Sequence, residues 1–169
     1  MSMSIKERSL FLLKHAQFFT LASRSLDGSV WAATLSYVVN RIPLKIIWCS
    51  ERHARHSENL RHDNRVSGAL YLADLPVESP LGIDGAQFIG VSREVPENQT
   101  DEVYRYFSCQ KFPDESIRTQ WMPPLSEFAR QGSRRFYELD ITELWLLDTD
   151  RWLESKKDKR IAVDLSNGL

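Results

Sequence analysis

The chain has 169 residues, of which 42% are hydrophobic and 27% charged, and its formal net charge is −1. These values are ordinary for one soluble globular domain, which we expect to span residues 1–169. A charge so close to zero excludes a global field that would attract nucleic acid or an anionic membrane, so any anion site must be local. No apolar run approaches the roughly 20 residues that cross a bilayer, so the expected location is cytoplasmic, with no membrane partner.

Turn signals divide the chain into many short strand-forming segments. In chain order, strands are predicted over residues 18–23, 30–39, 44–49, 65–73, 84–95, 134–140 and 143–148, with 161–165 as a further edge strand. The dipeptide Asp27-Gly28 is a strong hairpin signal, and Gly90 favours a kink in its strand.

Helical patterns occupy the remaining parts of the chain. Apolar residues at helical spacing predict a helix over 4–15, and the polar segment 50–64 favours a short exposed helix that Ser50 can cap. A third helix is predicted from Asn98 to Lys111. Segments 74–83 and 114–132 are predicted as irregular, the second with one helical turn.

Hairpin succession of the strands predicts a mainly β, α+β fold. Antiparallel connections dominate, which suggests a small β-barrel with two or three peripheral helices. We expect a C-terminal tail over residues 152–169, in which 154–160 is a solvated run of charges.

The polar helix start is the first candidate for chemistry. A helix N-terminus offers free N–H groups and partial positive charge, and Arg52, Arg55 and His56 beside it would complete a phosphate cradle. A solvated helix with surface arginines is the alternative interpretation. A metal site built from His53, His56 and His62 is not predicted, because paired His ligands on a helix usually sit four residues apart, these sit three and six apart, and no carboxylate or thiol is placed to complete the set.

Three strand segments are further candidates. Ala32 and Ala33, between Trp31 and Thr34, are small enough to let a flat ring approach the backbone. Gln87 lies among small residues and could face a cofactor. Packing within the barrel is the alternative for all three, including Trp145 in a late strand.

The sequence contains no recognisable arrangement of catalytic side chains. It has no Gly-x-Ser-x-Gly motif, no Gly-rich phosphate loop and no cysteine pair, since Cys49 and Cys109 stand apart. A bound cofactor is therefore expected to supply any reactivity.

These segments together resemble a known family. The strand end Ile47-Trp48-Cys49-Ser50, the triplet Ala54-Arg55-His56 and the strand start Asn64-Arg65-Val66 follow one another as in the pyridoxamine 5′-phosphate oxidase-like FMN-binding split barrels. Trp31-Ala32-Ala33, Gly85-Ala86-Gln87-Phe88-Ile89-Gly90 and Phe112-Pro113 are similar to elements of its YhbP-like branch. The resemblance covers residues from about 10 to 150.

The resemblance implies an antiparallel split β-barrel that forms a homodimer with FMN in two clefts between the subunits. Arg55 and His56 would bind the FMN phosphate, with Ser50 nearby. The backbone of residues 31–34 would follow the edge of the flavin ring. Gln87 and Trp145 would complete the pocket, with Trp145 contributed by the partner chain.

The same resemblance implies an FMN-dependent oxidoreductase that acts on a small-molecule substrate or electron donor. Leu153 stands where the true oxidase has the histidine of an Arg-x-His motif, so genuine pyridoxamine 5′-phosphate oxidase activity is not expected. Three alternatives stay open: a non-enzymatic flavin carrier or sensor, a deazaflavin protein, and a haem-binding or haem-degrading relative with His15 or His53 as ligand.

Overall fold

A computed structural model describes residues 3–41, 43–73, 83–166 and 168–169. The strands are β1 (Phe18–Arg24), β2 (Val30–Ser36), β3 (Val38–Arg41), β4 (Leu44–Glu51), β5 (Arg65–Ala73), β6 (Ile83–Glu94), β7 (Arg134–Leu147) and β8 (Arg160–Ala162). The helices are α1 (Ile5–His15), α2 (Arg55–His62), α3 (Thr100–Lys111), α4 (Glu115–Trp121) and α5 (Thr149–Ser155), with 3₁₀ turns at η1 (Glu97–Gln99) and η2 (Leu125–Phe128).

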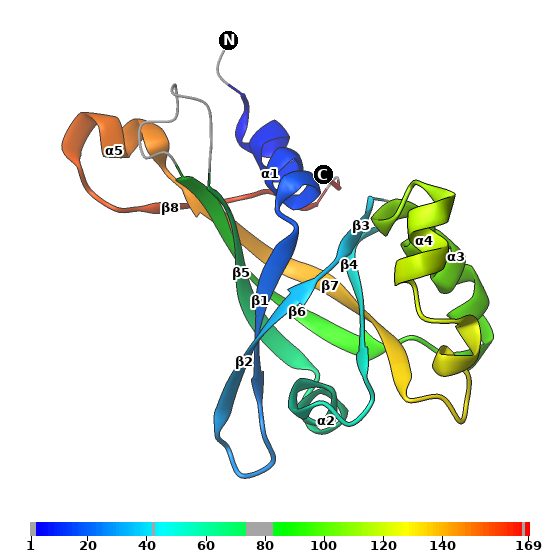
Figure 1. The fold of residues 1–169 in the computed structure, drawn as a ribbon. Helices are drawn as coiled ribbons and strands as arrows, with labels where there is room; N and C mark the ends of the chain where they lie inside the picture. The colour runs from blue at the N-terminus through cyan, green and yellow to red at the C-terminus, as the bar shows by residue number, and fades with distance from the viewer. Residues whose placement is uncertain (1–2, 42, 74–82, 167) are drawn as a thin grey trace.

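All strand pairs are antiparallel, in the order β2-β1-β5-β6-β7-β4-β3, with β8 paired to β7. The path begins at β2 and ends at β3, two strands that Tyr37 alone separates in the sequence. The chain therefore passes from one edge of the sheet to the other at a single residue, and the barrel is open between these edges. Figure 1 shows the curled sheet with α1 above it and α2 below. The predicted antiparallel split barrel is confirmed.

The core fills the concave side of the sheet. Trp48, Tyr137, Phe19 and Phe88 are almost fully buried there, and the rings of Trp48 and Tyr137 stack at 5.5 Å. Each of these side chains points inward from its strand, so the residues directly before and after it in the sequence point to the outer face. A second cluster packs beneath α3 around Phe128 and Phe136, whose rings stack at 4.4 Å.

Helix α1 closes the upper end of the barrel. Ser4 and Glu7 form a capping box at its start, which fixes where the helix begins. Arg8 forms an ion pair with Asp84 of β6, and the buried Tyr37 hydroxyl donates a 2.8 Å hydrogen bond to the Leu13 carbonyl. These contacts attach α1 to strands from distant parts of the sequence.

Two strand predictions need correction. Residues 30–39 form two strands, β2 and β3, because the chain changes sheet edge at Tyr37. Residues 134–140 and most of 143–148 instead belong to one continuous strand, β7. The break predicted between them is a bulge at Thr142, where the pairing with β6 shifts register. Gly90 lies at that shift, and a Cβ there would collide with the backbone oxygen of Asp140. The kink predicted at Gly90 coincides with this register shift.

The helix predictions also change. The segment 50–64 is helical only over Arg55–His62, and Ser50 belongs to β4 instead of capping the helix. The segment 114–132 contains α4 and η2, and the tail contains α5, capped by the Asp148 side chain. The described residues therefore hold five α-helices instead of two or three. Most of the loop predicted over 74–83 lies outside the described residues.

In the part of the chain that the structure describes, none of the helices is long and apolar enough to cross a membrane.

Candidate functional site

The N-terminus of α2 lies at the lower end of the barrel (Figure 1). Ala54 occupies its N-cap position and provides no side-chain hydrogen bond to the first turn. An uncapped first turn leaves backbone N–H groups available to an anion, and the helix dipole favours negative charge there. Asn59 fastens the helix to the barrel by donating a 3.0 Å hydrogen bond to the buried Ser23.

Arg55 is the first residue of this helix. Its guanidinium group donates hydrogen bonds to the hydroxyls of Ser29 at 2.9 Å and Ser25 at 3.4 Å. The same group lies over the Trp31 ring, 4.7 Å from the ring centroid. The hairpin that joins β1 to β2 therefore holds Arg55 in place, and the cation lies on an aromatic face.

His56, the next residue, points the other way. Its side chain is buried, and Nε2 lies 2.8 Å from the Ser50 hydroxyl. Burial lowers the pKa of His56 below its ordinary value of 6.5, so the ring is neutral at neutral pH. His56 and Ser50 are thus brought together as predicted, but as a neutral hydrogen-bonded pair and not as a second positive charge beside Arg55.

A cleft of about 810 Å³ opens between α2 and the β1–β2 hairpin. Arg55, His53 and His62 contribute basic side chains to it, and Asp27 and Glu58 contribute acidic ones. The Ser29 hydroxyl and amide keep the pKa of Asp27 low, and His53 lies 3.6 Å from Glu58. Among the described residues that line the cleft, Arg55 is the only arginine or lysine.

The predicted segment Trp31–Thr34 divides between two faces of the sheet. Residues directly opposite each other in an antiparallel pair share a face. Trp31 pairs with the buried Ser23, so it faces the interior and α2, and Ala33 lies on the same side. Ala32 and Thr34 point to the outer face.

Gln87 and Trp145 lie side by side on that outer face, opposite each other on β6 and β7. Gln87 is exposed and lines a separate cavity of about 390 Å³ together with Tyr71 and Trp152. One copy of the chain therefore brings Trp31, Ser50, Arg55 and His56 together around α2, and Ala33 lies on the same face of β2 as Trp31. Ala32, Thr34, Gln87 and Trp145 form a second group on the other side of the sheet.

Sequence reasoning missed Ser25 and Ser29 as members of the site. They flank the Asp27-Gly28 turn, and Gly28 has the positive φ of 84° that such a hairpin requires. The hairpin signal was readable, but its position above Arg55 depends on packing between segments about 30 residues apart.

The described residues contain no group of three or more His, Cys, Asp or Glu side chains positioned to hold a metal ion. The two cysteines differ in exposure: Cys109 is exposed and Cys49 is half-buried. Burial raises the pKa of the Cys49 thiol to about 11, so it stays protonated at neutral pH.

Several solved structures share this architecture. The chain is similar to a haem-binding protein from Mycobacterium smegmatis, with a TM-score of 0.67 and 15% identity over 95% of this chain and 59% of that one. It is similar to HutZ, the haem storage protein of Vibrio cholerae, with a TM-score of 0.60 and 14% identity over 84% of this chain and 94% of that one. A FAD-binding protein, mll6688, from Mesorhizobium loti has a TM-score of 0.61 and 16% identity over 84% and 92%.

The chain thus shares the split-barrel fold of these solved structures, which is the fold that the resemblance in the sequence implies. The chain spans less than two thirds of the length of the Mycobacterium smegmatis protein. No protein-family model matches the sequence, and a search of curated proteins finds no significant match.

Proposed function

We propose that this protein binds FMN between two copies of the chain and uses it in an oxidoreductase reaction on a small molecule. The observation that carries the proposal is the position of Arg55 at the uncapped start of α2, beside a cleft of about 810 Å³. Arg55, the free N–H groups of the helix and the hydroxyls of Ser25 and Ser29 would hold the phosphate.

The aromatic and small residues next to Arg55 suit the rest of the cofactor. Trp31 and Ala33 lie on the face that Arg55 covers, so a ring system extending from the phosphate would follow β2. His56 contributes as a neutral hydrogen-bonding group held by Ser50. FMN, when bound, supplies reversible one- or two-electron transfer, and the role of these residues is to bind and orient it.

The second copy is proposed because the predicted site is divided within one chain. Gln87 and Trp145 reach a flavin near α2 only if they come from another subunit. The middle of the outer face that carries them has no charged side chain over the area formed by Thr20, Ala22, Ala32, Thr34, Ser67, Ala69, Tyr71, Gln87 and Ile89, and the exposed Arg24, Arg65 and Glu143 border it.

This uncharged face favours a second copy of the chain as its partner. The side chains of Tyr71 and Ile89 are 64% and 42% exposed, which is unusual for large apolar groups on one side of a sheet. A surface without charge can pair with itself about a two-fold axis without repulsion. We therefore propose a homodimer with two equivalent sites.

Haem is the second candidate, because His53 and His62 both line the α2 cleft and the His53 side chain is 75% exposed. Two of the similar structures are haem proteins, and one binds FAD. His15 is placed less well for this role, since its Nδ1 contacts the Phe11 carbonyl on α1, at the other end of the barrel.

The test is to purify the protein, release any chromophore by heat and identify it by absorbance and mass. Apo-protein is then titrated with FMN and with riboflavin, which has the same ring without the phosphate. We expect FMN to bind at least about tenfold more tightly, because Arg55 and the helix start engage only the phosphate. Equal binding of FMN and riboflavin contradicts the phosphate assignment, and release of haem supports the second candidate.

A further inference from the structure

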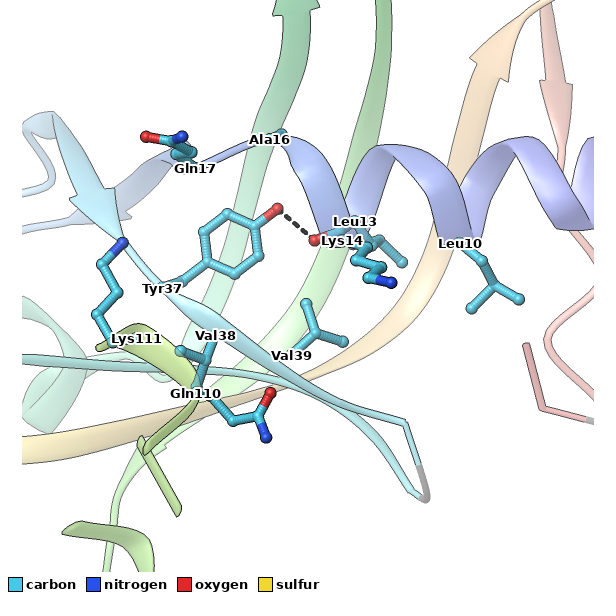
Figure 2. Close-up of a pocket in the computed structure, with 10 residues that line it drawn as sticks. All are labelled: Leu10, Leu13, Lys14, Ala16, Gln17, Tyr37, Val38, Val39, Gln110 and Lys111. Atoms are coloured by element: carbon cyan, nitrogen blue, oxygen red, sulfur yellow. Dashed lines mark hydrogen bonds between the residues drawn. The ribbon is translucent and has the colours of Figure 1, made fainter. Parts of the chain in front are cut away.

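A cavity of about 610 Å³ lies between α1, β3 and the end of α3 (Figure 2). Leu13, Tyr37 and Val38 form an apolar floor that is buried in the barrel. Lys14 and Lys111 lie at its rim, from helices almost a hundred residues apart in the sequence. Figure 2 shows the two lysine side chains on either side of the Tyr37 ring.

The charge of this cavity is one-sided. Its polar lining consists of the two lysines and the amides of Gln17 and Gln110, and none of the described lining residues is acidic. Neither lysine forms an ion pair with any described residue, whereas Lys45 on β4 pairs with Glu138 at 2.8 Å. Lys111 is half-buried, contacts the Phe18 ring at 5.8 Å, and has a pKa that burial lowers.

The walls of the cavity are held in place before any ligand arrives. The Tyr37 hydroxyl donates to the Leu13 carbonyl at 2.8 Å, which joins the floor to α1. The Tyr106 hydroxyl donates to the Val39 carbonyl at 2.8 Å, which joins α3 to β3. A cavity of this volume with fixed walls falls in the range of small-molecule sites.

We propose that this cavity binds a small organic anion whose charged head lies between Lys14 and Lys111 and whose apolar body lies on Tyr37 and Val38. An anion is favoured because it would supply the counter-charge that a half-buried lysine lacks. An apolar body is favoured because the Tyr37 and Val38 side chains offer it carbon, the Tyr37 hydroxyl being already bonded to the Leu13 carbonyl, while much of the remaining lining is polar and suits the charged head.

This site is separate from the proposed flavin site. None of its lining residues lines the α2 cleft, and α1 and α2 lie at opposite ends of the barrel (Figure 1). Binding here does not depend on whether the α2 cleft holds FMN, haem or nothing. The inference is therefore tested on its own, with apo and chromophore-loaded protein.

The experiment is calorimetric titration with octanoate, with octanamide of the same length but no charge, and with inorganic phosphate. We expect octanoate to bind once per chain and at least about tenfold more tightly than octanamide. Lys14→Met and Lys111→Met should each weaken octanoate binding roughly tenfold. Lys6→Met, which removes a charge from the exposed face of the same helix, should leave it unchanged.

Labelling provides a second readout that localises the ligand. Octanoate should slow acetylation of Lys14 and Lys111 by an amine-reactive reagent, with no effect at Lys6, as followed by peptide mass spectrometry. The proposal is overturned if octanoate and octanamide bind equally, if only inorganic phosphate binds, if no probe binds at millimolar concentration, or if the lysine variants bind like the parent protein.

Discussion

The guanidinium group of Arg55 lies over the indole ring of Trp31 at 4.7 Å, with two serine hydroxyls as its hydrogen-bond partners. This contact joins the helix start after β4 to the second strand of the barrel. In this arrangement the cation is held in place beside the cleft, so less side-chain freedom is lost when an anion binds.

Arg55→Met is expected to weaken FMN binding by roughly tenfold to a hundredfold, because one charge-assisted interaction with phosphate is lost. Riboflavin binding should change little. Fluorescence titration measures both. Arg52→Met is the matched control: the sequence predicts Arg52 as part of the phosphate cradle, but in the structure it does not line the cleft, so its loss removes a charge from the same segment only. An Arg52 effect as large as that of Arg55 would point to a diffuse field instead of a specific contact.

The buried His56 should make stability depend on pH. Its pKa in the folded protein is below the ordinary 6.5, so between these two values the unfolded chain binds more protons. The free energy of unfolding is therefore fully retained above about pH 6.5 and decreases as the pH falls, by at most about 1.4 kcal/mol per unit.

Denaturant titrations at several pH values between about 7.5 and 5, a range that brackets the ordinary histidine pKa, would measure this decrease. His56→Gln should flatten it. His53→Gln, which alters a side chain that is 75% exposed, should keep the dependence of the parent protein. If both variants behave alike, His56 is not the source.

Tyr37→Phe should lower the free energy of unfolding by about 1 kcal/mol, because it removes the hydroxyl that donates to the Leu13 carbonyl and leaves that carbonyl unpaired. Chemical denaturation gives the value. The control is Thr119→Val, which removes an exposed hydroxyl from α4, and its stability should be close to that of the parent. If Tyr37→Phe leaves the free energy of unfolding unchanged, the hydrogen bond to the Leu13 carbonyl does not stabilise the fold as expected.

Ala69→Arg places a charge in the middle of the uncharged outer face, between Thr20 on β1 and Gln87 on β6. We expect this variant to be a folded monomer in sedimentation and to bind FMN poorly, because each site needs the second copy. Gln120→Arg adds the same charge to the exposed side of α4 and should stay dimeric. A parent protein that is monomeric at every concentration would contradict the proposed assembly.

Turn signals and runs of strand-forming residues allowed most strands to be predicted. Residues 18–23, 44–49, 65–73 and 84–95 match β1, β4, β5 and β6 closely, because strand propensity and local turn chemistry depend only on neighbours in the chain. Helix α5 was missed and α4 was expected only as one helical turn, because these short polar segments have no distinct pattern and depend on local caps such as Asp114 and Asp148.

By itself, the sequence predicted a small antiparallel barrel from local turn patterns, its split form through a family resemblance, and a basic helix start that includes Arg55. Only the tertiary structure decided which side chains share a face. It turned His56 inward, separated Gln87 and Trp145 from Arg55, and brought Lys14 and Lys111 to one cavity. The physical reason is that strand register and helix packing depend on contacts between residues distant in sequence, which no local pattern specifies.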